Sequence, residues 1–215
     1  MATNGEGPAA VAHSERLAVC ALLEDKGPLA PTLCEGWATA DLAAHLFVRE
    51  NRPWAGIGIL VPAFAGVTQG AMDGAKRSLG YEGLIRRIRS GPPRVMKPMD
   101  GRVNLVEYFV HHEDIRRAGD AAAGPRDDAA LDAALWANIK RGGRLLARKV
   151  KGPGLELVAP GHGSVMARSG SPIVKMTGSP QDLMLFLFGR KGAAKVEIDG
   201  PADAKRIVEE ASYGL

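Results

Sequence analysis

The most constraining feature of this chain is an uninterrupted helical pattern at residues 103–118. The run Val-Asn-Leu-Val-Glu-Tyr-Phe-Val-His-His-Glu-Asp-Ile-Arg-Arg-Ala contains no proline or glycine, and its apolar residues recur at helical spacing, which predicts a helix. Glu107 and His111 are four residues apart and therefore lie on one face of that helix. Three valines flank the same stripe and turn it toward the interior: Val103, Val106 and Val110.

A carboxylate and an imidazole on an inward face need partners, because burying either group alone is costly. A divalent cation satisfies both Glu107 and His111 if a third ligand comes from elsewhere in the chain. Two other readings stay open: a carboxylate–histidine hydrogen bond between helices, or two half-exposed polar groups. The spacing Glu-x-x-x-His arises often by chance on helices, so it does not choose among them.

Other polar residues of this helix have separate expected roles. Asp114 lies three residues beyond His111 on the same face, where a carboxylate can orient the imidazole. His112 is about a quarter turn away from His111 and falls outside the ligand set. Arg116 and Arg117 occupy the last turn, where cations suit a helix C-terminus.

A second inward histidine lies on the helix predicted at residues 41–50. Its apolar stripe includes a histidine and an arginine: Leu42, His45, Leu46 and Arg49. A histidine on such a face is more often a hydrogen-bonded core residue than a ligand. An antiparallel helical bundle nevertheless commonly builds metal sites from facing helices. His45, Glu107 and His111 would then leave one position open, as catalytic rather than structural zinc sites do.

Composition and charge exclude several classes of function. The chain has 215 residues and a formal net charge of +4. Its basic residues are scattered in short stretches without interleaved aromatic residues, which argues against nucleic-acid binding. The longest apolar stretch, residues 57–67, is broken by glycine and proline and is too short to span a bilayer.

Two cysteines, Cys20 and Cys34, argue against a disulfide scaffold and fit a reducing cytoplasm. Cys20 falls among apolar helical positions, whereas Cys34 lies close in sequence to His45 and is a candidate for contact with the site. The first residues show no basic region followed by an apolar run, so we expect no secretory signal. The remaining histidines, His13 and His162, are weaker ligand candidates and are expected to be exposed.

The pattern along the chain predicts an α+β fold with two domains. Helices are expected at 9–25, 41–50, 76–90, 103–118 and from 127 or 128 to 150, while residues 51–75 show no clear period. Gly152-Pro153-Gly154 suggests a boundary between a helical domain, 1–150, and a small domain, 151–215. The small domain is expected to contain strands at 155–159, 165–168, 172–177 and 195–199, and helices after Ser179 and at 201–212.

Three segments resemble the DinB-like, mycothiol-dependent maleylpyruvate isomerase superfamily. Residues 34–46 resemble its Trp…Asp-Leu-x-x-His motif, residues 104–118 its Glu-x-x-x-His-x-x-Asp helix, and residues 176–190 the Gly…Asp-Leu…Gly-Arg segment of its C-terminal domain. The closest resemblance is to an actinobacterial branch whose members are described mainly as metal-binding proteins.

The resemblance implies a DinB-like antiparallel four-helix bundle followed by a small C-terminal α/β domain. It assigns His45, Glu107 and His111 as ligands of zinc, or of nickel or another divalent ion. It also implies mycothiol, the small thiol of actinobacteria, as a cofactor. Arg190 matches an arginine that contributes to the isomerase activity, although a helix C-terminal cation beside Gly189 is an equal reading.

These expectations give three hypotheses for function. In the first, a cytoplasmic, metal-dependent thiol transferase or isomerase acts on a small electrophile, with Asp114 and Arg190 assisting. In the second, a non-catalytic metal or thiol sensor keeps the same ligands. In the third, His45, Glu107 and His111 form only a buried polar network.

Overall fold

The computed structural model describes residues 7–51, 65–91, 104–120 and 123–214. The chain divides into two compact units, Met1–Ala123 and Gly124–Leu215. A helical N-terminal region is followed by a four-stranded mixed sheet with helices, so the expected α+β class is confirmed. No helix in the described ranges is both long and apolar enough to cross a membrane.

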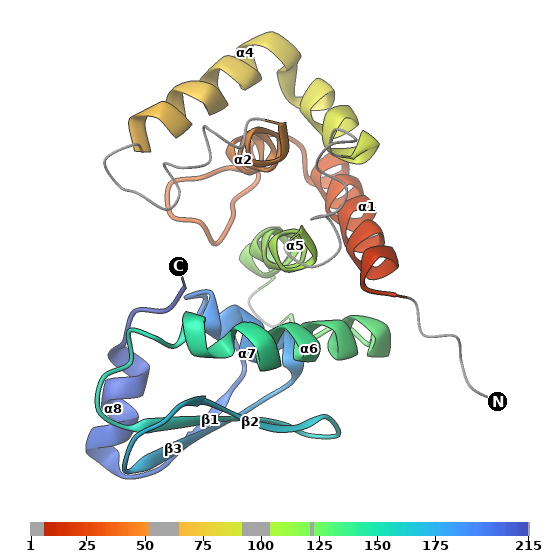
Figure 1. Cartoon of the computed structure of the whole chain (residues 1–215). Helices are drawn as coiled ribbons and strands as arrows, with labels where there is room; N and C mark the ends of the chain where they lie inside the picture. Colours follow the sequence, from red (N-terminus) through yellow and green to blue (C-terminus); the bar gives the residue numbers. More distant parts are fainter. Residues whose placement is uncertain (1–6, 52–64, 92–103, 121–122, 215) are drawn as a thin grey trace, which may run out of the picture. The chain divides into compact units, whose positions relative to one another are not determined.

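The described part of the first unit contains α1 (Pro8–Lys26), α2 (Thr39–Asn51), α4 (Ala65–Ser90) and α5 (Leu105–Gly119). Helix α2 packs mainly against α4, and α1 packs mainly against α5 (Figure 1). Their apolar faces share one core, whose largest buried side chains include Leu23, Leu42, Leu46, Met72, Leu84, Ile88 and Tyr108. The helix expected at 103–118 is α5, which begins at Leu105 in the structure. Val103 lies outside the described residues.

Helix α4 is much longer than the sequence suggested. It starts at Ala65 rather than 76, so helical residues replace the irregular structure expected for 65–75; residues 52–64 lie outside the described part. Three glycines at four-residue spacing, Gly66, Gly70 and Gly74, weaken the helical pattern because glycine is a poor helix former. Gly80, with φ of 64°, breaks the helical geometry within α4.

The second unit contains α6 (Ala129–Leu146), β1 (Gly154–Ala159), β2 (Gly163–Arg168), β3 (Ile173–Thr177), α7 (Pro180–Leu187), β4 (Glu197–Asp199) and α8 (Ala202–Glu210). The strand order is β2-β1-β3-β4, with β1 antiparallel to β2, parallel to β3, and β3 antiparallel to β4. Burial alternates along the strands, so one sheet face carries the core residues Leu155, Leu157, Ala167, Val174 and Met176. Because side chains of a strand point alternately to its two faces, this alternation made the strands predictable from the sequence.

Helix α6 belongs to the sheet unit, although the sequence placed it in the helical domain that ended at residue 150. It packs against α7 and β2, and its Gly143 lies close to the side chains of Leu157 and Ala167. Gln181 of α7 reinforces this arrangement by donating to Asp132 Oδ1 at 2.9 Å. The Gly-Pro-Gly segment at 152–154 is thus a turn into β1, and the units separate near Ala123.

Gly154→Ala should destabilise the second unit, because a Cβ at this position would lie 2.7 Å from the carbonyl oxygen of Gly170. The obstacle is backbone, which cannot rotate away, so we expect a loss of about 1–3 kcal/mol in urea unfolding. Gly192→Ala is the matched control, since a Cβ there meets nothing within 4 Å. Equal stability of the two variants would contradict the close approach of these segments.

Candidate metal site

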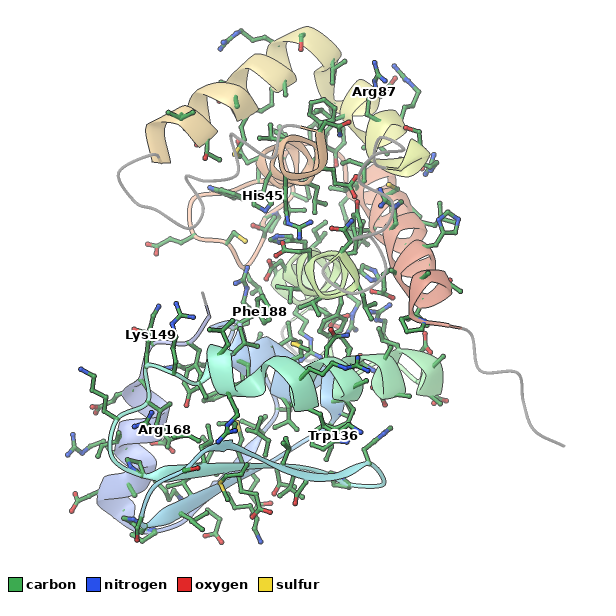
Figure 2. All side chains as sticks on the ribbon, in the orientation of Figure 1. His45, Arg87, Trp136, Lys149, Arg168 and Phe188 are labelled. Atoms are coloured by element: carbon green, nitrogen blue, oxygen red, sulfur yellow. The ribbon has the colours of Figure 1, made fainter. Side chains whose placement is uncertain are left out.

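Helices α2 and α5 bring together the three residues that the sequence selected as ligands. His45 comes from α2, and Glu107 and His111 come from α5. One potential ligand atom from each lies within 4.8 Å of the others. His45 and His111 are both 6% exposed, and Figure 2 shows His45 among the side chains of the first unit. The two imidazole nitrogens and one carboxylate oxygen fit zinc or another borderline divalent ion.

The His45 ring contacts two other rings. The centroid of Trp37 lies 5.2 Å from that of His45, and the ring of His111 lies 4.9 Å away in an edge-on arrangement. The sequence reading of His45 as an inward residue is therefore correct. Contact with His111 across the two helices distinguishes it from a histidine surrounded only by apolar side chains.

Asp114 contacts His111 in the way expected of an orienting carboxylate. Its Oδ2 lies 2.9 Å from His111 Nδ1, and the carboxylate is fully buried. When Nδ1 carries the proton and donates to Asp114, Nε2 is left with its lone pair for a ligand. That nitrogen is the one on the Glu107 side, 3.5 Å from Glu107 Oε2.

The protonation of His111 and Glu107 reflects this cluster. Burial by itself would lower the pKa of His111, but hydrogen bonds with Asp114, Cys34 and Glu107 raise that pKa well above its usual value. Burial by itself would raise the pKa of Glu107, but His111, Arg49 and His45 lower that pKa to about 2. The carboxylates around His111 thus favour its protonated form, and a divalent cation that binds the imidazole would displace that proton.

The lowered pKa of Glu107 predicts how stability depends on acid. The ionised carboxylate stabilises the metal-free fold above the unfolded value near 4.5, and this contribution disappears as the pH falls toward about 2. We expect the free energy of unfolding of wild type to fall between pH 5 and pH 3 by on the order of 1 kcal/mol more than that of Glu107→Gln. The measurement is urea unfolding of chelator-treated protein. Parallel losses in the two proteins would contradict this ionisation.

Cys34 contacts the site from the loop that precedes α2. Its thiol donates to Asp114 Oδ2 at 3.2 Å, and Leu33 N donates to the Asp114 carbonyl at 3.0 Å, which anchors the loop to α5. Cys34, His111 and Asp114 form a second group whose potential ligand atoms lie within 4.8 Å of one another. Cys34, a candidate for contact with the site, therefore reaches it through Asp114 and lies beside His111.

Two other residues considered in the sequence analysis, His112 and Arg190, make different contacts. His112 is buried with its Nδ1 3.6 Å from Glu15 Oε2 of α1, and it belongs to neither group of potential ligands. Arg190 follows α7 in the second unit, where its Nη1 donates to the Phe188 carbonyl at 2.8 Å. This contact is the one expected of a cation at a helix C-terminus, and a role for Arg190 in activity stays a prediction.

Sequence reasoning did not assign a role to Arg49, which the structure brings to the site. Its Nε lies 3.5 Å from Glu107 Oε2, and its Nη1 donates to Asn104 Oδ1 at 2.6 Å. The available signal was spacing, because Arg49 follows His45 by four residues on the same face of α2. Arg49 and Glu107 come from different helices, so only packing could pair them.

Asp114→Asn should weaken zinc binding by roughly ten- to a hundredfold, the usual effect of removing a carboxylate that orients a ligating histidine. The amide is nearly isosteric, so the fold should survive while His111 loses its fixed orientation. Affinity is measured by competition with a chromophoric chelator. Asp73→Asn, which replaces a half-exposed aspartate of α4, is a control that should leave affinity unchanged. Unaltered affinity in Asp114→Asn would contradict its orienting role.

Comparison with known proteins identifies the fold. The sequence matches no protein-family model and no curated protein. Among solved structures, the crystal structure of the mycothiol-dependent maleylpyruvate isomerase is similar, with a TM-score of 0.56 and 18% sequence identity over 90% of this chain and 93% of that chain. A histidine-to-alanine mutant of that isomerase gives a TM-score of 0.51 at 16% identity with the same coverage. At these identities the similarity shows a shared fold.

Proposed function

We propose that this protein binds one divalent metal ion through His45, Glu107 and His111, and uses it in a thiol-dependent transfer or isomerisation reaction on a small electrophilic molecule. The observation that carries the proposal is the convergence of two imidazoles and a carboxylate from α2 and α5 within 4.8 Å. The shared fold with a mycothiol-dependent isomerase supports the thiol and the class of reaction.

The ligand set suits catalysis better than a purely structural role. Structural zinc sites are usually closed by four protein ligands, whereas three protein ligands leave a position for a small molecule. A divalent ion held here would act as a Lewis acid and lower the pKa of a coordinated thiol, so that the reactive thiolate is present near neutral pH. Zinc suits this donor set, and nickel or another divalent ion is an alternative.

The protein's own residues would prepare that position. Asp114 holds the proton on His111 Nδ1 and keeps Nε2 directed toward Glu107. Ring contacts with Trp37 and with His111 help to orient His45. Arg190, carried over from the family resemblance, is proposed to bind a substrate carboxylate, for which a guanidinium has the matching geometry.

Turnover with a defined thiol tests this function. Zinc-loaded protein is incubated with mycothiol and a panel of small electrophiles that includes maleylpyruvate, and product formation is followed by mass spectrometry. We expect turnover that requires both zinc and mycothiol, that falls to background in Glu107→Ala, and that glutathione supports poorly. Glu82→Ala, an exposed glutamate on α4, is the matched control and should keep full turnover.

A non-catalytic metal or thiol sensor is the second candidate, favoured by the burial of His45 and His111, which are each only 6% exposed. A sensor would bind zinc tightly and show no turnover of any electrophile with either thiol. That result would contradict the proposed reaction and leave the metal site intact.

A further inference from the structure

Arg49 places a positive charge beside the candidate metal ligands. It follows His45 by one helical turn on α2, and its Nε lies 3.5 Å from Glu107 Oε2. The Arg49 side chain is only 17% exposed, so solvent screens its charge less than that of a surface arginine. A cation close to a metal site is electrostatically unfavourable unless anions compensate its charge. The placement of Arg49 therefore bears on the charge of the ligand that the site accepts.

A buried polar network fixes Arg49 in this position. Arg16 of α1 forms two contacts of 2.8 Å with the carboxylate of Glu50, and both side chains are nearly inaccessible. Glu50 Oε1 accepts from Asn104 Nδ2 at 3.4 Å, and Asn104 Oδ1 in turn accepts from Arg49 Nη1 at 2.6 Å. The network therefore connects α1 to the guanidinium of Arg49, and it limits the directions in which that group can move.

The charges around the site do not balance when a divalent ion is added. The ion contributes two positive charges and Arg49 contributes one, while the carboxylates of Glu107 and Asp114 contribute two negative charges. The cluster then carries one net positive charge in a largely buried place. A neutral ligand at the open position leaves that charge uncompensated, whereas a ligand with one negative charge removes it.

We propose that Arg49 is a specificity residue that makes the open position of the metal site prefer small anionic ligands, carboxylates or thiolates, over neutral ones. This inference rests on the proposed metal site and defines the charge of the group that enters it. Arg49 acts through its charge and its direction beside Glu107, and it does not itself bind the metal.

The test uses the full-length protein loaded with cobalt(II), whose visible absorption spectrum changes when a ligand enters its coordination sphere. Acetate and the thiolate of 2-mercaptoethanol are the two anionic probes, and imidazole is the neutral probe. We expect Arg49→Gln to bind both anions about tenfold or more weakly than wild type, with imidazole affinity unchanged. A loss confined to one anion identifies which of the two groups Arg49 favours.

Two further variants make the result specific. Arg49→Lys keeps the charge and should retain most of the preference for anions. Arg87→Gln removes an exposed guanidinium from α4 and should behave as wild type (Figure 2). Unchanged anion affinity in Arg49→Gln, an equal loss for imidazole, or loss of cobalt from that variant would each overturn the inference. Absence of cobalt binding by wild type would instead overturn the metal site itself.

Discussion

His45→Ala binds zinc roughly a hundredfold or more weakly than wild type, since three protein ligands would share a binding free energy of about 10–16 kcal/mol and the loss of one would cost about 3 kcal/mol or more. His45 is the sole contribution of α2 to the proposed ligand set, so its removal leaves only Glu107 and His111 on one helix. The affinity is measured by competition with a chromophoric chelator at a fixed pH.

Two observations accompany this prediction. His13→Ala removes an exposed histidine of α1 in the same unit and should keep wild-type affinity. Trp37 lies 5.2 Å from His45, so its fluorescence should be quenched by nickel(II) or cobalt(II) in wild type and not in His45→Ala. Equal zinc affinity of His45→Ala and His13→Ala would contradict the assignment of His45.

Arg16→Met lowers the free energy of unfolding by about 3–5 kcal/mol, because it leaves the Glu50 carboxylate buried without its partner. Arg16 and Glu50 are 2% and 3% exposed, and the Arg16 guanidinium also lies 4.6 Å from the centre of the Tyr108 ring. The measurement is urea unfolding of metal-free protein, followed by circular dichroism.

The control for this prediction is an exposed ion pair. Arg86→Met breaks the contact of Arg86 with Glu82, whose side chains are 70% and 88% exposed, and we expect no measurable change. The double variant Arg16→Met/Glu50→Leu should recover much of the lost stability, since it removes both buried charges. If Arg16→Met were as stable as Arg86→Met, the Glu50 carboxylate would be solvated in the folded protein, which would contradict the prediction.

Much of the fold and of the site could be predicted because the relevant signals are local. Glu107, His111 and Asp114 lie on one helix, so spacing alone places their side chains together. The strands of the second unit alternate between buried and exposed residues. Ser179 caps α7 by accepting a hydrogen bond from Asp182 N, as the sequence pattern indicated.

The remaining features depend on packing between distant segments. The sequence shows that α6 is a helix with one apolar face, but a helix of this kind can pack equally on other helices or on a sheet. The pairing of Arg49 with Glu107, and of Arg16 with Glu50, joins residues on separate helices. The sequence analysis missed the part of α4 at 65–75, because its glycines obscure the helical pattern. Packing of Met72 and Ala75 in the core stabilises the helix there.

The most direct test of this account is the metal content of the purified protein, measured by elemental analysis for wild type beside Glu107→Ala. We expect about one zinc, nickel or similar ion per chain in wild type, as three protein ligands can hold, and a large loss in Glu107→Ala. A wild-type protein that holds no divalent metal even after reconstitution would contradict the site. His45, Glu107 and His111 would then form a buried polar network on a shared fold.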